Sequence, residues 1–277
     1  MYKLICILLL AMMLGSVNTA CSRNHNSPEV PEQLSEDTLE TIEETEAAEE
    51  AETEDVVKTV KDELEAWIEN SKHIFLAQSR ELEGKQYFLV TYGMKKSSGY
   101  AVEIAEIESL EDCVQVHVTF RHPQQNEQAE TLITYPYALE SIDAAGLPVK
   151  FVVHGAEEYV PQLLEIDYVH PIVAQADGIK IFSPQPGSQV GRRFTVEGIA
   201  NVFEGNFQYK LTDNLGKTLL AGCSTAAMGD WKYFKLELNI DEKMPVGSHL
   251  QLVLYTQSAK DGSVSDQVVL ELAFAEI

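Results

Sequence analysis

The stretch from residue 87 to residue 107 places the strongest limit on how this chain can fold. Residues 87–92 (YFLVTY) and 100–105 (YAVEIA) each alternate between two faces, which is the two-residue period of a β-strand. Between them lies the loop GMKKSSG, closed by Gly93 and Gly99. We therefore predict that the two runs are paired strands and that the fold is mainly β.

The basic loop between these runs invites comparison with a phosphate-binding loop. Such a loop needs four residues between its glycines and a Lys-Ser/Thr pair directly after the second glycine. Here five residues separate Gly93 from Gly99, and Tyr100 follows. The loop is therefore predicted to be a plain hairpin connection.

Residues 113–120 (CVQVHVTF) form another clear strand candidate, with apolar side chains on one face and mixed side chains on the other. Cys113 and His117 would lie about 13 Å apart along an extended strand, whereas two zinc ligands converge at about 2.0 to 2.3 Å from one ion. This excludes the pair as a metal site, and His117 is expected at the surface. Further strand candidates extend this first β domain over residues 55–155.

Residues 178–277 contain seven short strand candidates separated by turn residues. This spacing favours an immunoglobulin-like β-sandwich as the second β domain, preceded by a linker at residues 156–177. The candidates are residues 179–182, 194–200, 206–212, 218–222, 233–238, 250–256 and 268–274.

The N-terminus has the features of an export signal. Residues 1–20 contain one lysine, an apolar run from Leu4 to Leu14, and a polar stretch that ends just before Cys21. The apolar run is shorter than the roughly 20 residues of a membrane-spanning helix, and its flanks are typical of a secretory signal peptide. A cysteine after a small residue at this place resembles the lipobox of bacterial lipoproteins, in which cleavage exposes the cysteine for diacylglycerol attachment.

The resemblance implies that Cys21 carries the lipid and anchors the protein at the extracytoplasmic face of the bacterial cell membrane. Thr19 and Ala20 fit the lipobox, whereas Asn18 departs from it, since that position usually holds an aliphatic residue. Two or three acyl chains at ~0.8 kcal/mol per buried methylene give stable anchoring. The alternative is ordinary cleavage after Ala20 and a secreted protein, although Asn18 also fits that site poorly.

An acidic segment follows the leader. The formal net charge of the chain is −24, and residues 29–69 contribute 17 acidic residues against two lysines, a net of −15. Residues 21–54 have few apolar and no aromatic side chains, so we predict a disordered acidic tether. Recruitment of a basic partner or of cations is the alternative role for this segment, and the overall charge disfavours nucleic acid as a partner.

A helical pattern begins at residue 55. Apolar residues recur every four positions with charged residues opposite, which predicts one amphipathic helix of about four turns. Trp67 lies beside this apolar stripe and is expected to dock into a core. The stripe consists of Val56, Val60, Leu64 and Ile68.

Two cysteines remain beyond the leader and Cys21. Cys113 and Cys223 lie one in each β domain, which is not the pattern of a disulfide scaffold. A single bridge between the domains is one alternative, and two buried thiols are the favoured one.

No motif predicts a catalytic site, a metal site or a cofactor. The pair Gly187-Ser188 does not complete a nucleophile elbow. Residues 213–216 and 261–263 are too short for calcium loops and have the composition of hairpin turns.

Three aromatic residues of the second domain are the candidate partner contacts: Trp231, Tyr233 and Phe203. If exposed together, they would form a patch for a glycan or a peptide. The alternative is that at least one of them belongs to the core.

Several features of residues 87–153 occur together in one known domain: Gly99-Tyr100 at the second strand, the strand CVQVHVTF, Pro136-Tyr137 and the closing VKFVV. They resemble the C-terminal domain of PrcB, a lipoprotein associated with a surface protease complex. The resemblance implies an extracytoplasmic accessory module that assembles or stabilises a partner, with no catalytic residues to carry over.

The second domain has its own set of marks in order: the Ser183-Pro184 opening, the Val-Glu-Gly198 strand, the Phe203-Glu204 corner and Trp231. They resemble the immunoglobulin-like domain named for bacterial spore germination proteins, a non-enzymatic module of exported proteins.

The expected function is therefore that of a membrane-anchored lipoprotein acting as a non-enzymatic binding or assembly module with a protein partner outside the cytoplasm. A surface complex such as a protease is the kind of partner that the first resemblance implies. The alternative is a receptor for cell-wall glycan or a germination-related ligand, and an envelope hydrolase is less favoured because no catalytic motif is present.

Overall fold

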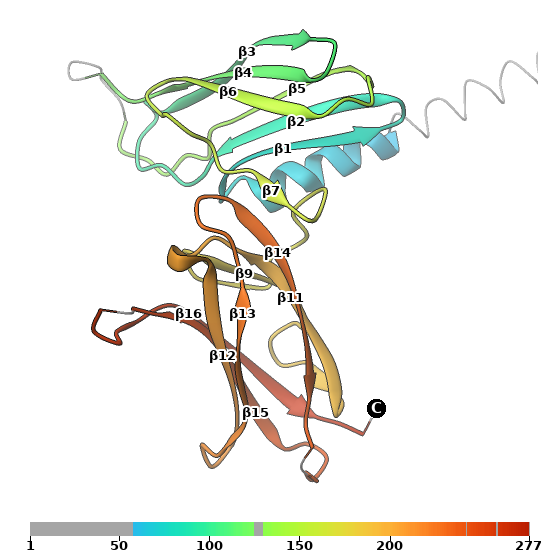
Figure 1. Ribbon diagram of the computed structural model, residues 1–277, viewed down its shortest axis with the longest axis vertical. Coiled ribbons are helices and arrows are strands. Elements are labelled where there is room, and N and C mark those ends of the chain that lie inside the picture. Colours follow the sequence, from blue (N-terminus) through green and yellow to red (C-terminus); the bar gives the residue numbers. More distant parts are fainter. Residues whose placement is uncertain (1–57, 125–129, 242, 259, 277) are drawn as a thin grey trace, which may run out of the picture. The chain divides into compact units, whose positions relative to one another are not determined.

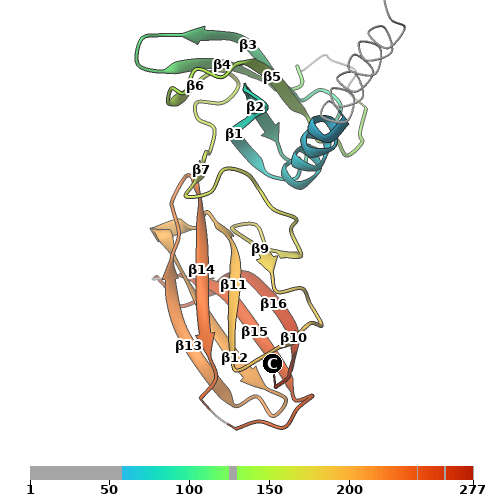
Figure 2. The ribbon, with the colours of Figure 1, turned by 90° about the vertical axis from the view of Figure 1, so that its right-hand side faces the viewer.

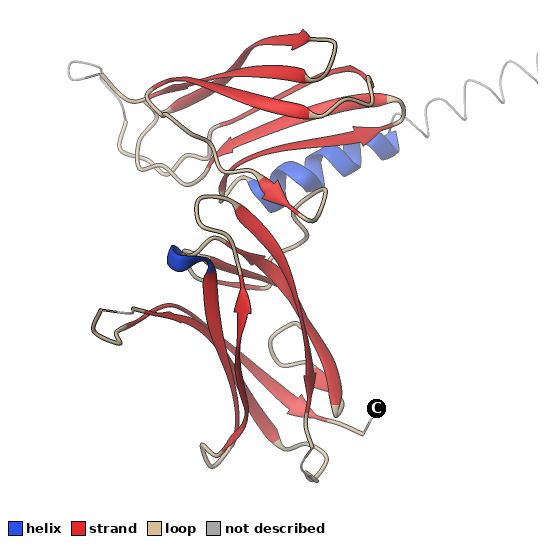
Figure 3. Ribbon diagram, viewed as in Figure 1, coloured by secondary structure: helices blue, strands red, loops and turns tan. Residues whose placement is uncertain are grey.

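The computed structural model describes residues 58–124, 130–241, 243–258 and 260–276. These residues are mainly β, with one α-helix and several sheets, which confirms the predicted fold class (Figure 3). Within these ranges no helix combines the length and apolar character needed to cross a membrane. The predicted signal segment, Cys21 and the acidic tether lie outside the described residues.

The first domain contains two three-stranded sheets (Figure 1). One is antiparallel, in the order β1 (Phe75–Leu82), β2 (Lys85–Tyr92) and β5 (Tyr137–Asp143). The other has the order β3 (Ala101–Ser109), β4 (Val114–Arg121) and β6 (Val149–Gly155), in which β4 and β6 run parallel.

The two runs predicted to pair across the Gly93–Gly99 loop lie in different sheets, so that prediction was wrong. β2 pairs with β1 through a two-residue turn at Glu83 and Gly84, whose φ angles are 46° and 72°. Two positive φ angles give a turn whose twist matches that of the flanking strands. Because β1 and β5 occupy both edges of β2, the chain crosses to the facing sheet, where β3 pairs with β4.

The facing sides of these two sheets form the first core. The apolar side chains of β4 are buried and alternate with partly exposed ones, as predicted. The approach of β6 to β4 requires a glycine at position 155, because its φ is 86° and a Cβ there would lie 2.2 Å from the Phe120 carbonyl oxygen. The buried members are Ala77, Phe88, Val90, Tyr92, Val114, Val116, Val118, Phe120 and Val160.

The helix occupies residues 58–71 and lies beside β1 (Figures 1 and 2). Trp67 is 1% exposed, which confirms that it docks into a core. Its indole Nε1 donates to Gln78 Oε1 at 3.0 Å, and Gln78 Nε2 donates to Ser71 Oγ at 2.9 Å. The backbone N–H of Val169 donates to the same Gln78 oxygen at 3.2 Å, so one buried amide joins the helix, β1 and the segment before the second domain.

The second domain is a sandwich of two five-stranded sheets. All seven predicted strands are present, each within a few residues of its predicted bounds. One sheet has the order β10 (Gln189–Val190), β16 (Val264–Phe274), β15 (His249–Gln257), β12 (Asn206–Asp213) and β13 (Thr218–Thr225). The other has the order β7 (Leu163–Leu164), β14 (Trp231–Asn239), β11 (Arg193–Ala200), β9 (Ile179–Ser183) and β8 (Ala174–Gln175).

Three two-residue strands were not predicted. β7 and β8 come from residues 156–177, the predicted linker, and pair with β14 and β9, while β10 pairs with β16. Two residues show no periodicity, so the sequence could not reveal them. The segment expected to be a linker is therefore partly built into a sheet of the second domain.

The sandwich core is apolar and tightly packed. Phe207 and Phe234 pack with ring centroids 4.8 Å apart. Gly198 on β11 permits the close approach of β9, because a Cβ there would lie 2.1 Å from the Lys180 carbonyl oxygen. Other buried members include Ile181, Val196, Leu211, Leu236, Leu252, Leu270 and Phe274.

A third apolar cluster contains residues of both β domains, and both belong to one compact unit. Trp231 is 6% exposed, and its Nε1 donates to the Phe75 carbonyl oxygen at 3.3 Å. Fully burying an aliphatic or aromatic side chain contributes ~1.5–3 kcal/mol to stability. This cluster therefore stabilises the contact between the two domains. Its buried members are Ile74, Leu76, Val169, Ile199 and Trp231.

Candidate functional site

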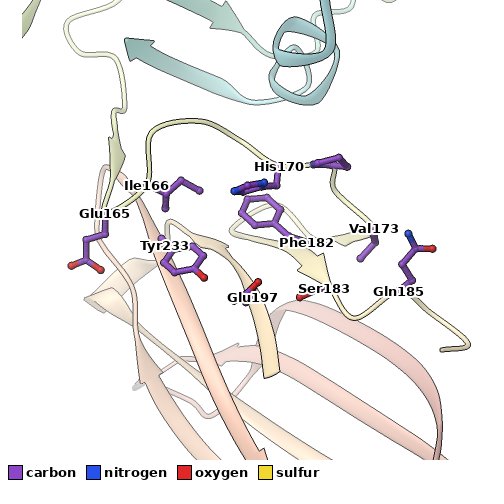
Figure 4. Close-up of a pocket in the computed structure, with 10 residues that line it drawn as sticks. Glu165, Ile166, His170, Val173, Phe182, Ser183, Gln185, Glu197 and Tyr233 are labelled. Carbon is purple, nitrogen blue, oxygen red and sulfur yellow. The ribbon is translucent and has the colours of Figure 1, made fainter. Parts of the chain in front are cut away.

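An open cleft of about 530 Å³ lies on the face of the β7-β14-β11-β9-β8 sheet that is turned away from the sandwich core. Its volume is in the range of small-molecule sites. Figure 4 shows Tyr233, Glu197 and Ser183 projecting from three strands, with Ile166, His170 and Val173 coming from the segment that precedes β8. The cleft is thus assembled from residues far apart in the sequence.

Acidic and basic groups are balanced around the cleft. Glu165 lies 3.3 Å from Lys232 Nζ, and Glu197 lies 3.8 Å from Lys235 Nζ. Burial raises the pKa of Tyr233 above its ordinary value, and its hydrogen bond to Glu197 adds to the rise. Tyr233 therefore stays a neutral hydroxyl that can donate or accept a hydrogen bond beside a carboxylate.

A row of aromatic rings borders the same cleft. His170 packs against Phe182 with ring centroids 5.3 Å apart and against Tyr168 at 4.8 Å. The guanidinium of Arg80 lies over the Tyr168 ring at 4.3 Å, within cation–π range. Of these rings, His170 and Phe182 line the cleft together with Tyr233 and give it planar surfaces next to hydrogen-bonding groups.

The three predicted contact residues lie in three different environments. Trp231 is buried in the cluster that joins the domains, so it is not available to a partner in this structure. Tyr233 is partly buried and lines the cleft. Phe203 lies on the 3₁₀ turn η1 (Phe203–Gly205) and is 81% exposed. The structure thus bears out the alternative that at least one of the three residues belongs to the core, and contact through Tyr233 or Phe203 stays a prediction.

Both described cysteines are free thiols. Cys113 is partly buried, whereas Cys223 is exposed. The prediction that both are buried was wrong, because Cys223 lies on the face of β13 opposite to Leu220, which packs against the sandwich core.

In the described ranges, no group of three or more His, Cys, Asp or Glu side chains is placed to hold a metal ion. The two acidic loops are hairpin turns, as predicted. Asp213 accepts hydrogen bonds from the backbone N–H groups of Leu215 and Lys217, both at 2.9 Å, and Asp261 accepts one from that of Ser263 at 3.1 Å. These carboxylates thus stabilise their own turns.

His117 lies on the outer face of β4, and 22% of its side chain is exposed. Its ring is stacked on that of His154, and His117 Nδ1 lies 3.1 Å from His154 Nε2. Cys113, which the strand geometry excluded as a metal partner of His117, has no role in this pair.

A second constellation lies in the first domain and was missed by the sequence analysis. Lys95, from the basic loop, places its ammonium 3.6 Å from the centroid of the Tyr92 ring, 5.4 Å from that of Tyr100 and 5.8 Å from that of Phe75. Burial lowers the pKa of Lys95 below its ordinary value, while the nearby Glu157 opposes this shift. We call this group the lysine box.

A carboxylate completes the lysine box. Glu157 Oε1 accepts a hydrogen bond from the Tyr92 hydroxyl at 2.5 Å and lies 3.3 Å from His122 Nε2. Burial raises the pKa of Tyr92, and Glu157 adds to the rise. The box therefore ties the end of β2, the crossover loop and the segment after β6 together.

Neither constellation had a clear signal in the sequence. The cleft draws its lining from residues 165 to 233 with no local motif. For the lysine box, two adjacent lysines in an acidic chain mark the loop as unusual. No sequence pattern indicates that Lys95 turns inward while Lys96 is exposed.

Two family models match this chain. Residues 178–263 match the immunoglobulin-like domain of bacterial spore germination. Residues 86–143 match the PrcB C-terminal domain. The matches cover the two predicted domain resemblances in the predicted order and confirm them. Together they suggest an extracytoplasmic binding-type module. No curated protein and no solved structure gives a significant match.

Proposed function

We propose that this protein is a membrane-anchored extracytoplasmic lipoprotein that acts as a non-enzymatic binding and assembly module. The observation that carries the proposal is the presence of the two matched domain types within one compact unit. The resemblance to PrcB supports a partner that is an exported protein complex, such as a surface protease. The leader and the lipobox-like sequence before Cys21 support the anchor.

The charge balance of the cleft supports a binding role over a hydrolytic one. Its two carboxylates, Glu165 and Glu197, are each paired with a lysine. Hydrolases need acidic or nucleophilic groups whose pKa values are tuned for proton transfer. We therefore expect the purified chain to give no turnover in activity profiling with broad esterase, peptidase and glycosidase substrates, and turnover would favour an envelope hydrolase instead.

Anchoring is tested by metabolic labelling with a palmitate analogue. The wild-type chain should be labelled and should fractionate with membranes, while Cys21→Ala should lose the label and be retained as precursor or released. An unlabelled wild type, or equal labelling of both proteins, would support the secreted alternative.

Assembly is tested by purification of the full chain from detergent-solubilised membranes. The expected result is one other protein in a fixed ratio to this chain, which dissociates at high salt if electrostatics steer the association. Recovery of the chain alone, at all salt concentrations and after mild cross-linking, would contradict the assembly role.

The cleft favours one other candidate function, that of a receptor for cell-wall glycan. Sugar rings stack on aromatic faces and hydrogen-bond to carboxylates, and Tyr233, Phe182 and Glu197 offer both kinds of group in the cleft. A pull-down with purified wall material should then retain wild type and release Tyr233→Ala, with Phe203→Ala as the exposed aromatic control. Equal retention of the two variants would exclude the cleft as the glycan site.

A further inference from the structure

The sheet edges of the second domain are not protected equally. An edge strand presents unpaired backbone N–H and C=O groups, and proteins usually cover it or place charges along it. The two-residue strands β7, β8 and β10 pair with the outer sides of β14, β9 and β16. The fourth edge is β13, which has eight residues and, among the described strands, pairs only with β12.

The sequence of β13 also lacks chemical protection. The strand TLLAGCST contains no charged residue and no proline. Each long edge strand of the first domain carries charge, and β3 has three glutamates and a bulge within its nine residues. The pairing of β13 with β12 is regular from Leu220 to Thr225, so no bulge twists this part of the edge away.

The side chains of β13 leave its backbone accessible. Ala221 and Cys223 are exposed and small, while Leu220 packs against the sandwich core. Gly222 lies under the ring of Tyr209, and a Cβ there would lie 2.5 Å from the Tyr209 hydroxyl oxygen. The strand therefore packs against the core on one face, and no bulky or charged side chain of its own covers its unpaired edge.

We propose that β13 is a docking edge, to which an extended segment of a second protein adds one more strand. This inference rests on the proposed assembly function and names how the partner is held. Strand addition uses the main-chain hydrogen bonds of an exposed edge, so its affinity depends little on matched side chains. The segment can hold proline only where its backbone nitrogen faces away from β13, because proline cannot donate to the ladder.

The net charge of this chain indicates whether the added segment comes from a second copy or from a different protein. The chain has a formal net charge of −24, so a second copy is repelled and a cationic protein is attracted. β13 itself adds no charge that would oppose either approach. The occupant is therefore an extended segment of a different, basic protein.

The test places a photo-reactive amino acid at position 221 of the full-length chain in the cells that make it. Irradiation should join the chain to a different, basic protein, and mass spectrometry should map the cross-link to one segment of that protein. Cys223→Lys, which puts a charge on the edge, should lower the cross-linked fraction at least tenfold. Leu215→Lys is the matched control, because Leu215 is 86% exposed in the turn before β13 and its charge lies off the edge.

The unfolding midpoints of both lysine variants are compared with that of wild type. If Cys223→Lys does not fold, Ala221→Lys with the photo-reactive residue at position 223 takes its place. A cross-link between two copies, or one that persists in the folded edge variant, overturns the inference. A co-purifying partner without any cross-link at β13 overturns the docking edge but leaves the proposed assembly function standing. If neither a partner nor a cross-link is found, both proposals are overturned.

Discussion

The two β domains protect their sheet edges by different means. The first domain places charges on its edge strands, as on β3 with Glu103, Glu106 and Glu108. The second domain covers three edges with two-residue strands and leaves β13 bare. Charged edges discourage pairing, whereas a bare edge permits it. We infer that the first domain resists further strand pairing and that the second offers it at one place.

The two domains also share one apolar cluster, and the largest effect is expected from Trp231, which lies on β14 and packs against Ile74 and Leu76 of the first domain. Trp231→Ala removes a buried indole from the cluster that joins the domains, and such changes destabilise by ~3–5 kcal/mol. Phe203→Ala, at an 81% exposed residue, should change the free energy of unfolding by no more than ~0.5 kcal/mol. Urea denaturation measures both. Equal small effects would mean that Trp231 is a surface residue, as the partner-contact hypothesis required.

Close backbone approach occurs in both domains and can be compared directly. Gly155→Ala and Gly198→Ala each force a Cβ against a carbonyl oxygen, at 2.2 and 2.1 Å. Gly146→Ala is the control for Gly155→Ala, since its φ of 63° is also unfavourable for alanine but nothing lies within 4 Å, whereas Gly198 has no positive φ and tests the steric contact alone. We expect the first two variants to be less stable than the control by ~1–3 kcal/mol, the usual penalty of overpacking. A control as destabilised as Gly155→Ala would show that φ alone decides at that position, and a Gly198→Ala variant as stable as wild type would contradict the steric contact there.

The lysine box links separate segments of the first domain, and its effect on stability can be tested by removing one charge. Lys95→Met keeps an unbranched apolar side chain but removes the cation from the Tyr92 ring, a loss of ~0.5–2 kcal/mol. Lys96→Met changes the same charge at the exposed neighbouring residue and should have little effect. Thermal unfolding of both variants checks this. Equal melting temperatures would contradict a stabilising role of the box.

The smallest expected effect is the change in folding stability that Tyr159 causes at alkaline pH. Burial and a hydrogen bond to Asp230 raise the pKa of Tyr159 to about 12. An unfolded tyrosine has a pKa of about 10, so this group stabilises the fold fully below about pH 10 and loses that contribution as the pH rises through 12. Tyr159→Phe should therefore lose less stability between pH 9 and 12 than wild type or Tyr137→Phe. Parallel pH profiles of all three proteins would contradict the shift.

Regular periodicity made much of this fold predictable. The strand at residues 113–120 and all seven strands of the sandwich follow from alternation bounded by turn residues. Strand partners were less accessible, because alternation identifies a strand but not its neighbour. Gly84 is a turn signal before β2, but Glu83 is not a residue that favours a positive φ, so this turn did not identify β1 as the partner of β2.

The candidate sites were harder to predict than the fold. Trp231 belongs to an aromatic set that looked suited to binding, but burial depends on the first domain, which supplies Ile74 and Leu76 to the same cluster. The cleft depends on residues 165–173 packing over Tyr233, and the docking edge depends on strand order. Each is a property of the assembled fold and has no counterpart in a local sequence pattern.

Hydrogen exchange measured by mass spectrometry can distinguish the docking edge from the cleft as the site that holds the partner. It compares the chain alone with the chain in the complex isolated from membranes. If β13 is the docking edge, amides of residues 218–225 exchange much more slowly in the complex, while those of residues 165–173 are unchanged. Slower exchange at residues 165–173, with residues 218–225 unchanged, would show that the partner is held by the cleft and would contradict the docking edge.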